Sequence, residues 1–351
     1  MNVLVVFGGR SSEYEVACRS AAYVISQIDE QKYTVYTVGV TKAGKWMFTR
    51  ATREQIADGT WETLSENRAC VLSPDTMLHG LLFEDGEKIS MDVVFPVMHG
   101  KNGEDGAIAA LCQLAGLPQV GCSMTSGAIC MDKMLTKIIC EHFGIPQAGW
   151  SYCYAQEIRE DAEKAADRLM QNLSYPVFIK PCSAGSSVGI GKAKNRTELL
   201  AAIREAARHD FKVVAESFVK GQEVEVAVLG SRFDPTVSMA GEIAPTAEFY
   251  SYDAKYNDDT SALYIPAHVD EQTMQTLRKL AAKVFYHMDC AGMSRVDFFV
   301  REDGVVLFNE INTIPGHTVI SMYPKLMSAY GLDGRACMDA LITGALERGV
   351  E

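Results

Sequence analysis

Strand and helix patterns alternate along the first third of the chain, and this alternation limits the fold more than any other feature. Runs rich in apolar residues at Val3–Phe7, Thr34–Val40 and Met91–Val97 are typical of buried strands, and a helical repeat of apolar residues separates the first two. Such alternation predicts a mostly parallel sheet, with ligand contacts at the carboxyl ends of its strands. Because Gly8-Gly9 and His99-Gly100 directly follow two of these strands, we expect a binding site there.

The remainder of the chain has a different organisation. A helix is expected over about Ser126–Phe143, followed by strands around a Gly/Ser-rich loop and by an alternating strand at Glu223–Leu229. The total of 351 residues is enough for two or three domains. We predict an α/β fold in which an N-terminal domain with a parallel sheet (1–122) precedes two α+β subdomains (123–214 and 215–351).

Composition excludes several classes of partner. A net charge of −12 argues against nucleic acid or an anionic membrane as ligand, so that an anionic substrate would need locally concentrated lysines. No run approaches 18 apolar residues, and the N-terminal segment reads as a strand, not a signal peptide. None of the ten cysteines forms a C-x-x-C pair, which predicts reduced core thiols in a cytoplasmic protein.

Carboxylates and an amide gather on a predicted hairpin near the C-terminus. Two strand-like segments flank Asp303-Gly304, a strong hairpin turn signal. Folding places Asp297 opposite the end that carries Glu310 and Asn312, and residues two apart on a strand share a face. Three hard oxygen ligands beside Arg295 suit Mg²⁺ that also holds substrate phosphates. The alternative is a solvated hairpin whose charges have no shared role.

A lysine and a glycine/serine loop indicate a second part of the site. Lys180 ends a predicted strand directly before the loop Cys182–Gly189, whose N–H groups and hydroxyls suit phosphate binding. The spacing is not that of a P-loop, and an ordinary hairpin remains the alternative. Lys133 and Lys255 strengthen the case, because together they give three lysines for one polyphosphate. The long polar loop near 247–260 has the composition of a lid.

Polar residues also follow the strands of the first domain. The segment His99–Gly106 has three glycines that allow a ligand close to the backbone, and its Glu104 suits a cation. Glu13 and Glu15, after Gly8-Gly9, suit a substrate ammonium. A surface turn and a solvated loop are the alternatives for the two segments.

These motifs together resemble the D-alanine–D-alanine ligases of the ATP-grasp superfamily over nearly the full chain. The matching segments occur in the family's order and are Gly8-Gly-Arg-Ser-Ser-Glu-Tyr-Glu-Val16, His99-Gly-Lys-Asn-Gly-Glu-Asp-Gly106, Met131-Asp-Lys133, Lys180-Pro-Cys-Ser-Ala-Gly-Ser-Ser-Val-Gly189, Ala254-Lys-Tyr256, Arg295-Val-Asp297 and Glu310-Ile-Asn312-Thr-Ile-Pro-Gly316. The resemblance implies an ATP-grasp fold and ATP-dependent joining of two D-alanines through D-alanyl phosphate for peptidoglycan synthesis. It also implies a cytoplasmic homodimer.

The resemblance implies a role for each candidate residue. Two Mg²⁺ ions, for which Mn²⁺ can substitute, would be held by Asp297, Glu310 and Asn312. The nucleotide would contact Lys133, Lys180, Ser187, Glu216, Val219, Glu223 and Lys255. The first D-alanine would meet Glu13, with His99 also contacting substrate, and a triad of Glu13, Ser186 and Tyr256 would close the lid. The oxyanion would face Arg295 and the Gly316 N–H, and the second substrate's carboxylate would meet Ser321 and Met322.

The sequence departs from the family pattern at three places. Ala17 stands at a common serine, where we expect a lost helix cap, and Ala184 replaces a frequent glutamate. Val319-Ile320 replaces a common Ser-His and is expected to add apolar bulk beside the second substrate. A D-alanine–D-serine ligase of the vancomycin-resistance type is therefore the alternative, although Met322 stands where those enzymes tend to carry Arg. A non-catalytic nucleotide-binding protein on the same fold is a third hypothesis, against which all metal ligands and Arg295 are present.

Overall fold

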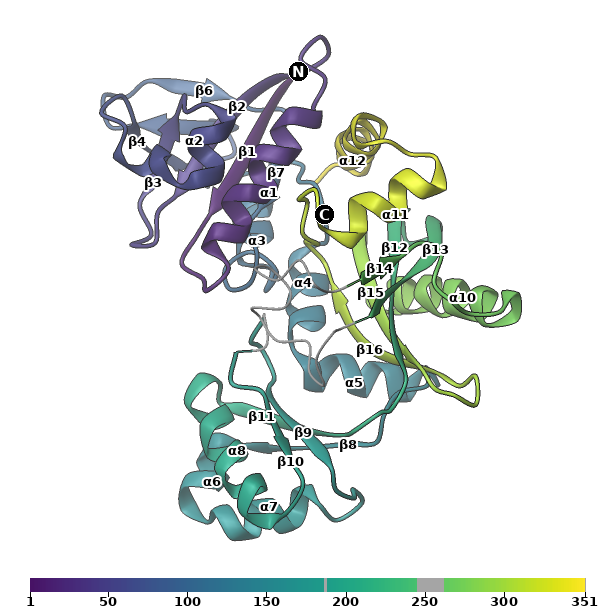
Figure 1. Cartoon of the computed structure of the whole chain (residues 1–351). Helices are drawn as coiled ribbons and strands as arrows, with labels where there is room; N and C mark the ends of the chain where they lie inside the picture. Colours follow the sequence, from purple (N-terminus) through teal and green to yellow (C-terminus); the bar gives the residue numbers. More distant parts are fainter. Residues whose placement is uncertain (186–187, 245–261, 351) are drawn as a thin grey trace.

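A computed structural model describes residues 1–185, 188–244 and 262–350. Among these residues the fold contains three sheets, which Figure 1 shows with helices around each. Four residues expected in the site, Ser186, Ser187, Lys255 and Tyr256, lie outside the described ranges, as does nearly all of the expected lid loop.

The first sheet has the strand order β6-β5-β4-β3-β2-β1-β7. Strands β2, β1 and β7 pair in parallel as predicted, and four antiparallel strands, which the sequence patterns did not reveal, extend the sheet from β2. The elements of this region are β1 (Asn2–Gly8), α1 (Tyr14–Gln27), β2 (Thr34–Val40), β3 (Trp46–Thr49), α2 (Arg53–Asp58), η1 (Thr60–Thr63), β4 (Arg68–Leu72), β5 (Gly80–Phe83), β6 (Lys88–Ser90), β7 (Val93–Val97) and α3 (Ala107–Leu114).

The second sheet is antiparallel, in the order β10-β9-β11-β8. Helices α6, α7 and α8 pack on one of its faces through buried aliphatic residues. The elements are α4 (Met124–Met131), α5 (Lys133–His142), β8 (Trp150–Tyr154), α6 (Ala155–Glu160), α7 (Ala162–Leu169), β9 (Val177–Pro181), β10 (Gly191–Ala193), α8 (Arg196–His209) and β11 (Lys212–Ser217).

The third sheet is also antiparallel, in the order β14-β13-β12-β15-β16. Its elements are β12 (Gln222–Ser231), β13 (Asp234–Ala244), β14 (Ala262–Tyr264), α10 (Glu271–His287), β15 (Gly292–Val300), β16 (Val306–Asn312), α11 (Met322–Tyr330) and α12 (Gly334–Arg348). The alternating pattern expected for β12 is wrong, since its residues 224–229 are all buried. Val224, Val226 and Val228 pack with α10, whereas Ala227 and Leu229 pack with α11 and α12, so both faces are covered.

Two helices replace the single one expected over Ser126–Phe143. The chain leaves helical geometry at Asp132, which has φ −86° and ψ 101° and caps α5 by accepting a hydrogen bond from the Leu135 N–H. The same carboxylate pairs with the buried Lys212 of β11. The break therefore follows from a cap and an ion pair whose second partner is distant in sequence.

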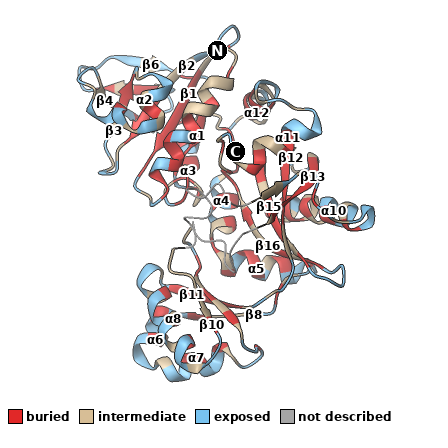
Figure 2. Ribbon diagram, in the orientation of Figure 1, coloured by how far each residue is buried: buried red, intermediate tan, exposed pale blue. Residues whose placement is uncertain are grey.

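The C-terminal helices return to the first domain. Residues of α11 and α12 share one hydrophobic core with α1, β1 and β7, which Figure 2 shows as buried segments facing one another. Ala17 is buried in the interior of α1 and Glu13 is the N-cap residue, so the lost cap expected at Ala17 is wrong. The domain boundaries stay a prediction; the one at 214/215 falls within β11.

Within the described residues, no helix is both long and apolar enough to span a bilayer.

Candidate active site

A cavity of about 580 Å³ lies where the three sheets approach one another. Its walls come from the strand ends of the first sheet, from β9 and β11 of the second, and from β12, β15 and β16 of the third. The expected site residues that line it are Glu13, His99, Lys133, Lys180, Glu216, Val219, Glu223, Arg295, Glu310, Asn312, Gly316, Ser321 and Met322. Two described candidates lie outside this lining: Glu15, and Asp297, which contributes no lining atom but accepts hydrogen bonds from the lining residue Arg295.

The predicted hairpin forms with the expected register. In the β15–β16 pair Asp297 lies opposite Glu310 and Arg295 opposite Asn312. Asp303-Gly304 makes the turn, where Gly304 has φ +79°, a conformation that favours glycine. Arg295 donates two hydrogen bonds to Asp297, of 2.8 and 2.7 Å. Two carboxylates and an amide therefore meet on one hairpin beside a guanidinium.

This donor set fits a magnesium site. Asp297, Glu310 and Asn312 supply hard oxygen atoms, and Mg²⁺ completes few protein contacts with phosphate and water. Asn312 Oδ1 accepts a hydrogen bond from the Ile314 N–H at 3.0 Å, which leaves one lone pair for a cation. Among the described residues no three His, Cys, Asp or Glu side chains gather at one point.

Sequence reasoning missed Glu225, which lies 3.1 Å from the Arg295 guanidinium. The signal was present, because Glu223 and Glu225 are two apart on β12 and share a face. Burial opposes the charge of Arg295, but Asp297 and Glu225 outweigh that effect and raise the guanidinium pKa above its ordinary value. Arg295 is thus a permanent cation held between two carboxylates.

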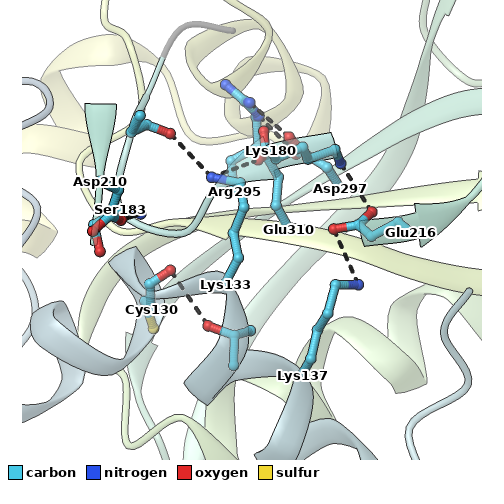
Figure 3. A network of polar contacts seen from close by, with 12 residues as sticks. Cys130, Lys133, Lys137, Lys180, Ser183, Asp210, Glu216, Arg295, Asp297 and Glu310 are labelled. Atoms are coloured by element: carbon cyan, nitrogen blue, oxygen red, sulfur yellow. Dashed lines mark hydrogen bonds and ion pairs between the residues drawn. The ribbon is translucent and has the colours of Figure 1, made fainter. Parts of the chain in front are cut away.

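Two lysines converge on one buried carboxylate in the cavity wall, as Figure 3 shows. Lys180 Nζ lies 2.9 Å and Lys137 Nζ 3.4 Å from the oxygens of Glu216. Burial alone would raise the pKa of Glu216, yet the lysine charges hold it at about 2. Burial lowers the pKa of Lys137, and the nearby Glu216 carboxylate only partly offsets that effect. Sequence reasoning missed Lys137, although its position one helical turn from Lys133 is a signal.

Lys133 connects the Gly/Ser loop to the hairpin. Its Nζ donates to the Ala184 carbonyl at 3.1 Å and lies 4.0 Å from Glu310 Oε2. A phosphate chain between this loop and the hairpin would therefore meet an ammonium. The structure brings Lys133, Lys180 and Glu310 into one cavity, as the sequence predicted.

Glu13 lies between two glycines from different parts of the chain. A Cβ at Gly100 would approach Glu13 Oε2 to 2.5 Å, and one at Gly185 to 2.6 Å. The carboxylate therefore fits against both the 99–106 loop and the Gly/Ser loop only because these positions lack side chains. Glu15 lies away from the cavity and pairs with Lys42 at the surface.

The segment after β16 lines the opposite end of the cavity. Ser321 precedes α11, and its Oγ accepts a hydrogen bond from the Thr318 N–H at 3.1 Å. Met322 is buried, and Ile320 lines the cavity. Val319 is 79% exposed and lies outside the lining, so the apolar bulk expected from it is wrong. Lys325, which sequence reasoning did not single out, also lines this end.

A cavity between two antiparallel sheets, lined by lysines and a carboxylate hairpin, defines an ATP-grasp enzyme. Two family models match: D-ala D-ala ligase N-terminus over residues 2–122, and D-ala D-ala ligase C-terminus over residues 139–343. The chain belongs to the D-alanine–D-alanine ligase family, and its ATP dependence and ligase class follow from that membership.

Curated relatives agree over the full length. The D-alanine–D-alanine ligase of Acetivibrio thermocellus is 44% identical, with 99% of this chain and 96% of that protein covered. The D-alanine–D-alanine ligase of Clostridium acetobutylicum is also 44% identical, with 99% and 98% covered. The ligase activity expected from the sequence is thereby confirmed.

Two solved structures are close in fold. VanG D-Ala:D-Ser ligase from Enterococcus faecalis has a TM-score of 0.90 at 38% identity, with 98% of this chain and 99% of that chain covered. The D-alanine-D-alanine ligase from Coxiella burnetii has a TM-score of 0.86 at 33% identity, with 99% and 96% covered. The predicted ATP-grasp fold is confirmed by these likenesses.

Proposed function

We propose that this chain forms D-alanyl-D-alanine for peptidoglycan synthesis, with ATP as co-substrate and Mg²⁺ as metal. The observation that carries the site assignment is the facing register of Asp297 and Glu310 on a hairpin that Lys133 approaches to 4.0 Å. Bound magnesium would neutralise phosphate charge and hold the γ-phosphate for attack. Asp297, Glu310 and Asn312 are the residues that would hold it.

The chain's own groups supply positioning and charge in the first step. The carboxylate of the first D-alanine attacks the γ-phosphorus, and the bond to ADP breaks. Lys133 and Lys180 would hold the phosphates, and Glu13, the buried N-cap residue of α1, would hold the substrate ammonium. Such alignment is the main source of acceleration in phosphoryl transfer.

In the second step the amine of the second D-alanine attacks the acylphosphate carbon. A C–N bond forms, phosphate leaves, and the amine loses a proton. Arg295 and the Gly316 N–H would stabilise the oxyanion, and donors placed in this way contribute about 3–4 kcal/mol each. The N-terminus of α11 at Ser321 would receive the second carboxylate, because helix N-termini favour anions.

The alternative product is D-alanyl-D-serine, which the likeness to the VanG structure favours. Against it, Met322 and Ile320 present apolar surface at the end of the cavity where the second substrate would lie.

We also propose a cytoplasmic homodimer in which Mn²⁺ can replace Mg²⁺. The ten buried, unpaired cysteines support a reducing compartment.

One experiment separates these products. The protein is incubated with ATP, Mg²⁺ and D-alanine, alone and with D-serine or D-lactate, and the products are identified by mass. D-Alanyl-D-alanine as main product supports the proposal. Mostly D-alanyl-D-serine at equal concentrations would replace it with the alternative, and ADP formation without dipeptide would contradict both.

A further inference from the structure

The loop 313–318 places the Gly316 backbone N–H at the cavity, a donor without a protein acceptor among the described residues. The N–H groups of Ile314, His317 and Thr318 each donate to a side-chain oxygen, and Pro315 has none. Among the described residues the Gly316 N–H has no protein acceptor, and Gly316 alone within 313–317 is not buried. Since a free donor in a held loop is suited to a developing charge, what holds the loop determines where that donor points.

Two residues of the first domain hold this loop on both sides of Gly316. His99 Nδ1 lies 2.8 Å from the Ile314 carbonyl, and Ser20 Oγ lies 3.1 Å from the His317 nitrogen. His99 Nε2 and Ser20 Oγ are 2.8 Å apart. Both side chains are buried. The contacts therefore form a closed ring of hydrogen bonds across the boundary between the first and third sheets.

When the His99 imidazole is neutral, the chemistry of its partners fixes the direction of each hydrogen bond. A carbonyl only accepts, so His99 Nδ1 carries the proton and donates to Ile314. His99 Nε2 is then an acceptor, and the Ser20 hydroxyl donates to it. The lone pair of Ser20 remains for the His317 N–H. Ser20 is thus the one group that links the imidazole to the far side of Gly316.

We propose that Ser20 and His99 are positioning residues that aim the Gly316 N–H at the oxygen of the tetrahedral intermediate. His99 thereby acts through the loop and not as a substrate ligand, because both of its ring nitrogens have protein partners. The inference rests on the proposed function for its catalytic consequence. The hydrogen-bonded ring itself is a structural statement that can be tested separately.

The test uses the full-length protein with Ser20→Ala and a matched control, Ser238→Ala. Ser238 is also fully buried and also accepts a backbone N–H, from Ala227, but lies outside the cavity. Ser20→Ala is expected to lower kcat for dipeptide formation by about 10- to 100-fold, since misplacing a catalytic donor by about 1 Å has effects of this size. KM for ATP is expected to change less than about twofold. Ser238→Ala should keep the parent's kcat.

Two further readouts separate positioning from general damage. Positional isotope exchange in labelled ATP reports the first phosphoryl transfer, which should stay within about threefold of the parent because Gly316 acts on the second step. Hydrogen exchange of the His317 amide, which donates to Ser20, should accelerate in Ser20→Ala and not in Ser238→Ala. Ser20→Cys, which keeps a weaker hydrogen-bonding group on a slightly larger side chain, should fall between the parent and Ser20→Ala.

The outcomes distinguish the two proposals. Unchanged exchange at the His317 amide, or a kcat for Ser20→Ala within threefold of the parent, would overturn the positioning role while leaving the ligase assignment intact. If the unmodified protein formed no dipeptide, the ligase assignment would be refuted. Faster exchange in Ser20→Ala would still support the hydrogen bonds of Ser20 and His99 to the loop.

Discussion

Glu216 illustrates how a charged group is kept in the cavity wall. Its carboxylate is buried, and the ammonium groups of Lys137 and Lys180 hold its pKa at about 2 against the effect of burial. A carboxylate with a depressed pKa adds stability above its unfolded pKa and loses it as the pH falls through the folded value. For Glu216 the window runs from about pH 4.5 down to about 2, and the contribution is on the order of 3 kcal/mol.

Replacing Lys137 with Met tests this reading. The pKa of Glu216 should rise toward its ordinary value, so the variant should lose less stability than the parent between pH 5 and about pH 2. Urea unfolding across this range measures the difference. Lys279→Met, an exposed control on α10, should keep the parent's pH dependence. Parallel curves for the parent and Lys137→Met would show that Lys137 does not stabilise the ionised Glu216.

The hairpin ligands give a second prediction at the scale of single residues. Glu310→Gln and Asp297→Asn keep the shape of each side chain but remove charge from the proposed metal site. ADP formation should fall at least about a hundredfold, while the free energy of unfolding changes little. Glu302→Gln, in an exposed pair with Lys220 beyond the end of β15, should keep full activity. Activity of either site variant within fivefold of the parent would refute the metal assignment.

At the scale of elements, the break between α4 and α5 depends on Asp132. Its side chain caps α5 and pairs with the buried Lys212. Asp132→Ala removes the cap and leaves the buried Lys212 ammonium without its carboxylate partner. The free energy of unfolding should therefore fall by about 3–5 kcal/mol. Asp333→Ala removes only the exposed cap of α12 and should cost about 1 kcal/mol. Equal losses in denaturant titrations would show that the Lys212 pair adds nothing.

These elements show which features a sequence can predict. The β15–β16 hairpin followed from local information, namely a turn signal and the two-residue period of a strand. The break at Asp132 did not, because the ion-pair partner is on β11, eighty residues away. The sequence of β12 predicted one buried and one exposed face, but helices cover both of its faces. A local sequence pattern does not show which elements pack on a strand. Sequence patterns identified the candidate residues that lie in contiguous motifs. They missed Glu225 and Ser20, because the contacts of these residues are with partners distant in sequence.

The start of α11 carries the prediction for substrate choice. Met322 is apolar, so a serine hydroxyl would lose hydration there without regaining a bond from this side chain. Such a loss is about 1–3 kcal/mol, which predicts an excess of D-alanyl-D-alanine of about 10- to 100-fold at equal concentrations. Met322→Arg should shift the ratio toward D-serine in competition assays. The control Val319→Arg adds the same charge at an exposed site and should leave the ratio unchanged.

At the scale of the whole molecule, the cavity gathers lysines and carboxylates from all three sheets. The cations in its lining are Lys133, Lys137, Lys180, Arg295 and Lys325, and the carboxylates are Glu13, Glu104, Glu216, Glu223, Glu225 and Glu310. The core shared by α1, β1, α11 and α12 holds the first domain against the third sheet, so the cavity walls from these two parts are fixed together. A polyphosphate in this cavity would therefore need a bound cation beside the carboxylates as well as the lysines.

This arrangement predicts that ATP and Mg²⁺ stabilise the chain together. A ligand that binds only the folded state at a hundred times its Kd adds about 2.7 kcal/mol, so the Tm should rise when MgATP is present. The rise should shrink when EDTA replaces the metal, because Glu310 and Asp297 would then face the phosphates without a cation between them. In Glu310→Gln the Tm rise should depend less on the metal, since one of the two carboxylates is gone. Equal rises with Mg²⁺ and with EDTA in the unmodified protein would show that the nucleotide binds without metal at this hairpin.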